Sequence, residues 1–540
     1  MSFRGILNSK QKTIGGAVSV LAIAVLLSRI LGVVRDRLLA GSFGASIDLD
    51  IYFAAFRIPD LIYSIIFAGG VLVSLLPLFS DFYNEKKEKS WDFINNLINH
   101  FLIFFVIAGI LFFVFSPKLI SSMVGGFDSE AVEKTIELTR LIFVSIFFFG
   151  LSSIFSTILN YFNRFVSYSL APILYNLGII MGIIFFAPYW GIFGVGAGVI
   201  FGSFLHLLVQ IPTALKCGYR YKFVLNFKDP GIREFLTLIV PRAIASSSSQ
   251  INFIVITFIA SGIGVGAISV FNLSNNLRYL PIGIIGVSFA TASFPLLSRL
   301  WVEGKKEEFC NNFVKVFNEV LYVSFPIGVL IFILRNEIVD IFLRTGSFTS
   351  SAAEITAAAL GLFFISTFAQ CLVPIILRGF FSLKDTVTPT FIAILFVIFN
   401  VYLSFFFVSL FSGDNNFTQM MKELMGLNGT INFSVLGLVL AFNIGLLFEF
   451  ILLFVSFKRK VKSLEVKKIL KSFVKIAISS FLMGIFAYYV LPLSKEISSS
   501  SLLQFSLISL ASFVIYAILT MALRMPEINT VKRLIIRNGN

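Results

Sequence analysis

The stretch "GLVLAFNIGLLFEFILLFV", residues 437–455, is apolar around almost its whole helical circumference. A helix needs about 20 apolar residues to cross a hydrocarbon core of roughly 30 Å, and runs of this kind recur along the chain. Of the 540 residues, 57% are hydrophobic and 13% are charged, and the mean hydropathy is +0.93. A soluble protein of this composition lacks the polar residues to cover its surface. The sequence therefore predicts an all-α polytopic membrane protein.

The hydrophobic runs predict about fourteen transmembrane helices. Two of the segments, 48–79 and 266–298, are longer than one membrane thickness and contain prolines, so we expect them to be tilted, kinked or extended beyond the bilayer. The predicted helices are 13–34, 48–79, 93–115, 134–160, 167–187, 190–215, 234–260, 266–298, 309–334, 351–377, 386–411, 433–456, 472–491 and 502–524.

The basic residues indicate the orientation of these spans. With a cytoplasmic N-terminus, both tails and the even-numbered loops hold most of the Lys and Arg, as the positive-inside rule predicts for a multi-pass protein with both ends in the cytoplasm. The formal net charge of +15 comes largely from "KCGYRYKFVLNFK" and "KRKVKSLEVKKILK". We interpret these loops as topology signals that attract anionic membrane lipids, and not as a nucleic-acid site. The opposite side carries Arg35, Arg37, Lys118, Arg335, Arg344, Lys422 and Lys495.

Two halves of the sequence resemble each other at a nearly constant offset. "RIPDLIYSIIFAGGVLVSLLPLFS" (57–80) matches "RYLPIGIIGVSFATASFPLLS" (278–298), and "NRFVSYSLAPILYN" (163–176) matches "LKDTVTPTFIAILF" (383–396). Each pair compares a span with the one six later, which predicts two six-helix lobes as parallel repeats around a central cavity. We expect an N-terminal lobe at 1–222, a C-terminal lobe at 223–460, and two additional helices with a cytoplasmic tail at 461–540.

The sequence offers little for catalysis. Its cysteines are far apart, and the chain has only two histidines, so we expect no metal site. There is no G-x-x-x-x-G-K-[ST] loop for a nucleotide. We also expect no catalytic residues and no cofactor, which leaves an ion gradient or the membrane potential as the unidentified energy source.

Several arginines fall in or beside spans, where a charged side chain is expensive and normally faces water, a partner or a ligand. Arg29 lies deep in the first span, and Asp36 shares its helix face, while Arg35 points elsewhere unless Gly32 allows a bend. Arg57 and Arg278 lie in the two long segments. Together they predict a cationic cavity for anionic cargo, and the planar fork of arginine suits phosphates.

Three stretches resemble the signature regions of the MurJ (MviN) family of lipid II flippases, in the multidrug/oligosaccharidyl-lipid/polysaccharide exporter superfamily. They are "SRILGVVRDRLLAGSFGASIDLDIYFAAFRIPDLI" (28–62), "LPIGIIGVSFATASFPLLSR" (280–299) and "GFFSLKDTVTPT" (379–390). The resemblance covers nearly the whole chain and implies two six-helix lobes around a cavity, with two extra C-terminal helices that form an apolar groove for the lipid tail.

The resemblance also implies site residues. Arg29 and Arg35 match two functionally important arginines, Asp36 follows the second, and Asp50 matches a further acidic position. Tyr63 and Asn276 stand where the family usually has arginines, so Arg57 and Arg278 are candidate substitutes. The expected substrate-binding set is Arg29, Arg35, Asp36, Asp50, Arg57, Asn276 and Arg278.

The predicted function is transport of lipid II, the undecaprenyl-diphosphate-linked peptidoglycan precursor for cell-wall biogenesis and cell shape. The headgroup would pass from the inner to the outer leaflet of the bacterial inner membrane by alternating access, and we expect a monomer. Two transport alternatives are a flippase for another polyprenyl-diphosphate-linked glycan and a cation-coupled drug exporter, although the latter favours carboxylates in its cavity. A membrane-embedded glycosyl- or phosphotransferase lacks a convincing carboxylate pair. A scaffold or channel leaves the duplicated architecture unexplained.

Overall fold

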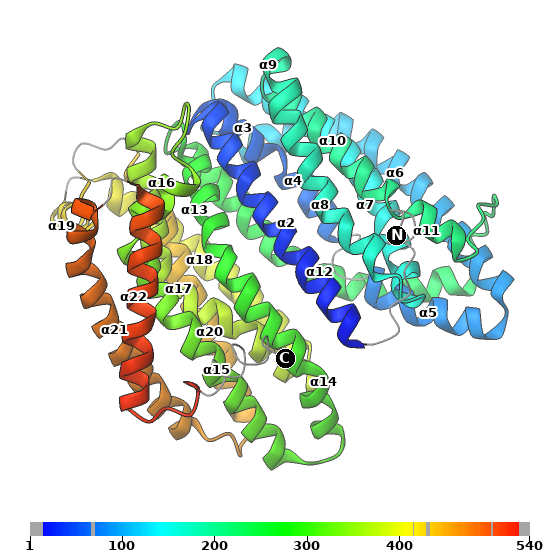
Figure 1. Cartoon of the computed structure of the whole chain (residues 1–540). Coiled ribbons are helices and arrows are strands. Elements are labelled where there is room, and N and C mark those ends of the chain that lie inside the picture. The colour runs from blue at the N-terminus through cyan, green and yellow to red at the C-terminus, as the bar shows by residue number, and fades with distance from the viewer. Residues whose placement is uncertain (1–13, 66–70, 414, 428–431, 498–499, 529–540) are drawn as a thin grey trace. The chain divides into compact units, whose positions relative to one another are not determined.

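The computed structural model describes residues 14–65, 71–413, 415–427, 432–497 and 500–528, and in these residues the regular structure is helical (Figure 1). Among them, eleven helices are long and apolar enough to cross a membrane, which confirms the polytopic helical class. The three other expected spans fall on α2 (Ile14–Phe43), on α3 to α5 (Ile47–Glu85) and on α12 (Pro230–Ser261). Each of these regions includes side chains outside the description, so the total of fourteen stays a prediction.

Contacts group the chain into two compact units, Met1–Ser269 and Val270–Asn540. The predicted boundaries at 222 and 460 concern the repeats and the appendage, and they stay predictions. The first unit contains, besides α2 and α12, the helices α3 (Ile47–Ala55), α4 (Arg57–Tyr63), α5 (Val71–Glu85), α6 (Lys87–Met123), α7 (Ser129–Tyr161), α8 (Phe165–Met181), η2 (Gly182–Phe186), α9 (Ala187–Trp190), α10 (Ile192–Leu208) and α11 (Ile211–Lys216).

In the first unit, glycines bring α8 and α10 into backbone contact. A Cβ atom on Gly178 would lie 2.2 Å from the Cα atom of Gly202, and one on Gly198 would lie 2.6 Å from the Cα atom of Gly182. Apolar side chains gain nothing by leaving lipid for each other, so membrane helices associate through such close packing of small residues. The glycines therefore hold α8 firmly, and α8 in turn packs against α2.

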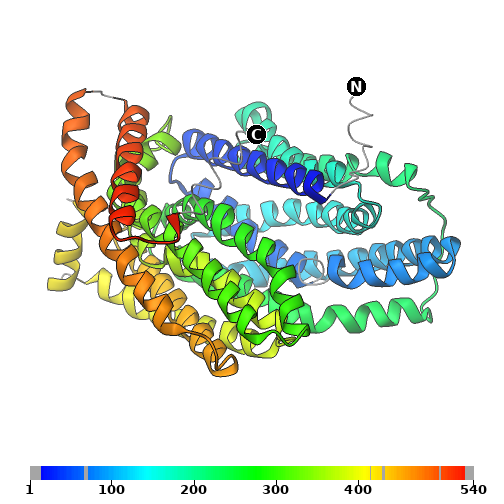
Figure 2. The same ribbon diagram turned by 60° about the horizontal axis from the view of Figure 1, so that its bottom comes forward.

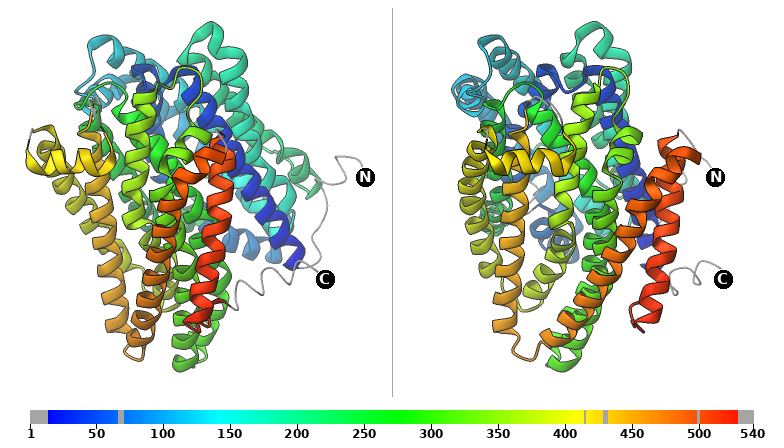
Figure 3. Two further views of the ribbon diagram at one scale, coloured as in Figure 1. Left: turned by 60° about the vertical axis from the view of Figure 1, so that its left-hand side comes forward. Right: turned by 90° about the vertical axis from the view of Figure 1, so that its left-hand side faces the viewer.

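The second unit begins within α13 (Ala267–Pro281) and ends with two packed helices. Figure 3 shows α21 and α22 side by side, and the hydroxyl group of Tyr516 on α22 donates to the carbonyl oxygen of Tyr322 at 2.9 Å. The remaining elements are η3 (Ile282–Gly286), α14 (Val287–Val302), α15 (Lys306–Ile333), α16 (Arg335–Phe342), α17 (Ser350–Ser382), α18 (Val387–Ser412), α19 (Asn416–Met425), α20 (Val435–Lys460), α21 (Val466–Ile497) and α22 (Ser501–Ala522).

The helix boundaries repeat as the sequence predicts. α6 runs over 87–123, while α15 and α16 together run over 306–342, so both ends are shifted by 219 residues. α7 and α17 each contain 33 residues and begin 221 residues apart. After them, Asn163 and Lys384 both adopt positive φ, at 56° and 59°. Matching lengths and turns over consecutive spans support the parallel repeats.

Both long proline-containing segments change helix type along their length. A π-helical stretch begins at Ser64 after α4, and another, η3, begins at Ile282, which is 218 residues later. Pro77 and Pro295 show the same spacing. Because π-helical turns inside helices often mark functional sites, their recurrence points to these two spans as functional elements.

Candidate functional site

Arg35 on α2 is the centre of a polar cluster within the first unit. Its Nε and Nη2 atoms donate to Oδ1 of Asp36 at 3.0 and 2.8 Å, and its Nη1 atom donates to Oδ1 of Asn176 at 3.2 Å. Asn176 lies on α8 and donates in turn to the backbone oxygen and hydroxyl of Ser28. The guanidinium is thus held from two helices.

The cluster leaves part of the arginine available. A guanidinium has five N–H donors, and the contacts to Asp36 and Asn176 use three of them. The Arg35 side chain is 22% exposed, whereas that of Asp36 is 8% exposed. This arrangement presents a fixed, partly exposed cation with two N–H groups to spare.

The contact between Arg35 and Asp36 joins neighbouring residues of α2. On a straight helix Arg29 and Asp36 share a face, and Arg35 points elsewhere unless Gly32 allows a bend. The side chains of Arg35 and Asp36 nevertheless meet, and Asn176 contacts the same guanidinium from α8. Gly32 lies beside this cluster, but a Cβ atom there would lie 4.0 Å from Oδ1 of Asn176, so the contact does not require a glycine. Arg29, on the same helix, is half-buried.

Asp50 on α3 is completely buried and accepts three hydrogen bonds. Its donors are the backbone N–H groups of Gly266 and Ser269, at 2.6 and 2.7 Å, and the hydroxyl of Ser269, at 2.6 Å. These groups belong to the first turn of α13 and the residue before it, where backbone N–H groups have no partner within the helix. Asp50 therefore caps α13, and its carboxylate faces protein donors and not solvent.

Arg57 on α4 is also buried and lies beside α12. Its Nε atom donates to Oγ1 of Thr257 at 2.8 Å, and its guanidinium stands 5.2 Å from the Phe253 ring centroid. Tyr63 is held separately by the Ser153 hydroxyl at 3.4 Å and by the Phe149 ring. The structure therefore does not place Arg57 at the position of Tyr63.

Arg278 on α13, within the second unit, has apolar surroundings. Its side chain is 1% exposed, and its guanidinium lies 4.3 Å from the Phe363 ring centroid and 5.1 Å from that of Phe442. One nitrogen, Nη2, donates to Asn275 at 2.7 Å, while Nε and Nη1 have no hydrogen-bond partner among the described residues. Asn276 is half-buried on the same helix. Stacking on aromatic rings, and not solvent, accommodates this charge.

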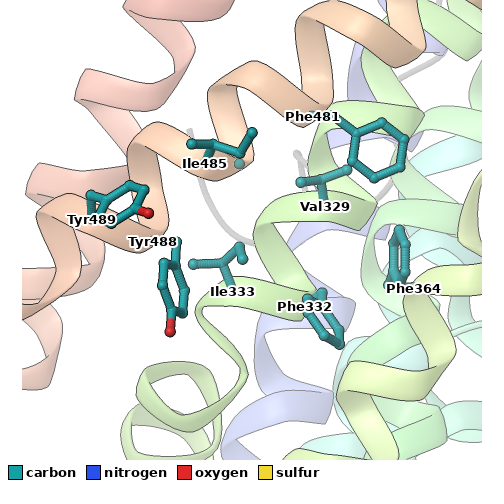
Figure 4. A pocket seen from close by; sticks show the side chains of 9 residues that line it. Val329, Phe332, Ile333, Phe364, Phe481, Ile485, Tyr488 and Tyr489 are labelled. Atoms are coloured by element: carbon teal, nitrogen blue, oxygen red, sulfur yellow. The ribbon is translucent and has the colours of Figure 1, made fainter. Parts of the chain in front are cut away.

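The second unit also has an apolar cavity of about 450 Å³ (Figure 4). Its walls come from α15, α17 and α21, and Figure 4 shows Ile485, Tyr488 and Tyr489 of α21 opposite Ile333 of α15. The lining residues are Val329, Phe332, Ile333, Phe364, Phe481, Gly484, Ile485, Tyr488 and Tyr489.

Asn176 was not among the predicted site residues. It lies 141 residues from Arg35, and buried asparagines are common in helices that pack tightly. Its position at the end of the repeated stretch 163–176 was the only available signal, and that signal concerned duplication and not binding. No group of three or more metal-ligating side chains occurs within the described ranges.

Comparisons with known proteins identify the family. The family model described as lipid II flippase MurJ matches residues 39–508. The chain belongs to the MurJ family. The probable lipid II flippase MurJ of Buchnera aphidicola subsp. Schizaphis graminum is 32% identical over 395 residues, which cover 71% of this chain and 77% of that relative. Lipid II flippase MurJ of Burkholderia cenocepacia is 27% identical over 394 residues, 71% of this chain and 76% of that relative.

Solved structures agree with this assignment. A structure described as lipid II flippase MurJ in an inward closed conformation matches with a TM-score of 0.76 and 26% identity, and covers 93% of this chain and 98% of that one. An inward-facing multidrug resistance MATE transporter of the MOP superfamily matches with a TM-score of 0.61 and 16% identity, over 83% of this chain and 98% of that one, and shows the fold alone. The predicted family and MurJ-like helical fold are confirmed, and MurJ membership makes the chain a transporter.

Proposed function

We propose that this MurJ-family protein translocates lipid II from the inner to the outer leaflet by alternating access, and that Arg35 binds the diphosphate of the headgroup. Family membership supports the substrate class, since the matching relatives are named lipid II flippases. The local observation that carries the assignment is a partly exposed guanidinium, held by Asp36 and Asn176, in which these contacts use three of the five N–H donors.

The chemistry of the cargo fits this arrangement. A diphosphate and its sugars pay a large desolvation cost in hydrocarbon unless polar groups replace their water. Two parallel N–H groups on a planar guanidinium match two oxygens of a phosphate. Because Asp36 and Asn176 already fix the plane of Arg35, little side-chain freedom is lost on binding. Arg29, on the same helix, supplies a second cation for the same anion.

The other predicted site residues have different surroundings, which suggest different roles. Asp50 acts as a positioning residue, because its oxygens are saturated by the start of α13. Arg57 is buried against Thr257, and Arg278 is buried against aromatic rings. We therefore assign structural roles to both arginines. Asn276 stays a candidate for headgroup contact through its half-buried position.

The apolar cavity beside α21 suits the polyprenyl tail. Its walls are aliphatic and aromatic, and Tyr488 and Tyr489 are well exposed at its edge. We propose that the tail rests there while the headgroup is bound elsewhere. The two repeats at 1–222 and 223–460 would then carry the transport function, and the helices in 461–540 would bind the polyprenyl tail.

The proposed setting is the bacterial cytoplasmic membrane, with both termini in the cytoplasm, as the distribution of basic residues indicates. We propose a functional monomer. An ion gradient or the membrane potential supplies the energy, and the potential is worth about 2.3 kcal/mol per charge per 100 mV.

The test is a leaflet-resolved lipid II assay in vesicles that contain only this protein. Arg35→Ala should slow translocation at least about tenfold, since hydrogen bonds to charged groups are worth about 1.5–3 kcal/mol each. Arg344→Ala is the matched control, because Arg344 is an exposed arginine that pairs with Asp340. Translocation by Arg35→Ala at the wild-type rate would refute the assignment of Arg35.

The same vesicle assay distinguishes lipid II from the most similar alternative cargo. Another polyprenyl-diphosphate-linked glycan shares the diphosphate but has a different headgroup. We expect lipid II to move faster than such a glycan in side-by-side measurement. Faster movement of the other glycan would replace the proposed cargo and leave the role of Arg35 intact.

A further inference from the structure

A segment of the first unit, residues 219–228 with the sequence "YRYKFVLNFK", runs without helix from α11 toward α12, and we call it the strap. Figure 2 shows this connection passing the end of α6. The strap begins after Gly218, whose φ is +101°, and Tyr219 is buried between the rings of Trp91 and Phe155. This end of the strap is thus firmly attached.

Three buried asparagines of α6 hold the rest of the strap. Asn95 donates to the carbonyl oxygen of Arg220 at 3.0 Å, and Asn99 donates to that of Val224 at 2.8 Å. Asn96 donates to the carbonyl oxygen of Asn226 at 3.1 Å and accepts from its N–H group at 2.9 Å. These contacts reach the strap backbone, and the Tyr221 hydroxyl also donates to Oδ1 of Asn99 at 2.9 Å.

Beyond Tyr219, every residue of the strap except Val224 is exposed. Phe223 and Phe227 are 71% and 70% exposed, and Tyr221 and Leu225 are exposed as well. Large apolar groups gathered on so short a segment are unfavourable in water and mark an interaction surface. The strap also carries Arg220, Lys222 and Lys228, all exposed, with Asp92 as an acidic neighbour 3.9 Å from Lys222.

The adjoining surface of α6 identifies the partner. One turn beyond Asn99, α6 begins a long series of exposed apolar residues suited only to lipid, including Phe104, Ile107 and Ile110. The His100 ring, at the border, stands 4.7 Å from the Phe227 ring. The strap therefore continues the lipid-facing surface at the level where the span becomes polar. Aromatic and basic side chains together are typical of the membrane interface.

We propose that the strap is an anchor for an anionic lipid surface, with its aromatic side chains at the edge of the acyl chains and its basic side chains on phosphate headgroups. In the orientation proposed above, this surface is the cytoplasmic leaflet. A second copy of the chain fits poorly, since two straps would oppose like charges. The inference does not require lipid II transport.

The experiment uses the full-length protein with Phe223→Trp in nanodiscs of phosphatidylcholine, with or without phosphatidylglycerol, and brominated acyl chains as quenchers. The added tryptophan should emit at shorter wavelength than in water and lose about half of its intensity with brominated lipid, since tryptophan favours the interface. Lys305→Trp, in the charged turn between α14 and α15, is the control and should stay unquenched.

The charge variant Lys222→Gln/Lys228→Gln, in the Phe223→Trp background, tests the headgroup contact. It should weaken the preference for phosphatidylglycerol on the order of tenfold, given about 1 kcal/mol per basic residue near an anionic surface. An unquenched Phe223→Trp in both lipid mixtures overturns the anchor. Equal quenching with and without phosphatidylglycerol overturns the anionic contact. A blue shift that appears only on addition of a soluble protein overturns the lipid assignment.

Discussion

Arg35 and Arg278 are both helical arginines that donate to an asparagine side chain, but their other surroundings differ. Arg35 has a carboxylate and an amide as partners and keeps part of its surface exposed. Arg278 lies on two phenylalanine rings and is 1% exposed. The residue type therefore does not decide the role. A charge that is fixed but unsaturated can bind cargo, whereas a charge enclosed by aromatic rings supports packing.

The largest expected effect comes from making the same substitution at both arginines. Arg35→Met should slow lipid II translocation on the order of 100-fold, because it removes two charge-assisted hydrogen bonds of about 1.5–3 kcal/mol each. Arg278→Met should stay within about twofold, since an apolar residue of similar volume often replaces a buried charge without loss. Vesicle translocation measured per folded molecule checks both. A comparable loss in the two variants would remove the distinction drawn between these sites.

Asp50 is a third kind of buried charge, because its carboxylate oxygens accept three hydrogen bonds from protein donors. Asp50→Ala should lower the free energy of unfolding by about 3 kcal/mol, because it leaves the N–H groups at the start of α13 buried without an acceptor. Thermal unfolding in detergent measures this, with Asp48→Ala on the same helix as the control. If Asp50→Ala unfolds like the wild type and only loses transport, Asp50 contacts cargo and is not a cap.

These contrasts also show which features can be predicted from the sequence alone. The eleven confirmed spans follow from local composition, because hydrophobic length acts within a few turns, and the duplication follows from similar segments at a nearly constant offset. Arg35 could be nominated from its motif, but its orientation toward Asp36 depends on Asn176 of another helix. The burial of Arg278 depends on Phe363 and Phe442, which lie 85 or more residues away. Such contacts are set by tertiary packing, which a single sequence does not display.

The same limit applies to the strap. Its basic and aromatic composition is visible in the sequence, and it suggested topology and lipid attraction. The asparagines that hold it lie about 125 residues earlier, on α6, and look like ordinary polar residues near a helix start. Side-chain contacts to the backbone leave no pattern of apolar periodicity, so they went unrecognised.

A smaller effect is expected from a change at Asn176, the second residue that accepts a hydrogen bond from Arg35. Asn176→Leu should slow translocation about tenfold, because it removes one acceptor of the guanidinium and lets the fork rotate. Asn443→Leu is the matched comparison, since Asn443 is also a buried asparagine in a membrane helix and bonds to Ser366. That variant should lose stability but keep its transport rate per folded molecule. Equal transport losses would mean that Asn176 acts through packing alone.

The smallest effect concerns an ion pair beside the turn that follows α17, which corresponds to the turn after α7 in the first repeat. Lys460 at the end of α20 donates to Oδ2 of Asp385 at 2.5 Å. Burial raises the pKa of the Asp385 carboxyl, but the hydrogen bonds from Lys460 and Thr388 outweigh it, so the pKa is lowered from its usual range. A lowered pKa in the folded state means that this contribution is complete at neutral pH and is lost as the pH falls below about 4.

Asp385→Asn should therefore reduce the free energy of unfolding by less than about 1 kcal/mol at neutral pH, as for other solvent-accessible ion pairs. The reduction should shrink at high salt, where screening weakens the pair in the wild type, and should vanish near pH 3. Thermal unfolding of both proteins between pH 7 and pH 3 measures this. Equal stability of the two proteins at every pH would show that Asp385 acts by capping α18 through Thr388 and not by its charge, because the asparagine oxygen can still accept from that N–H group.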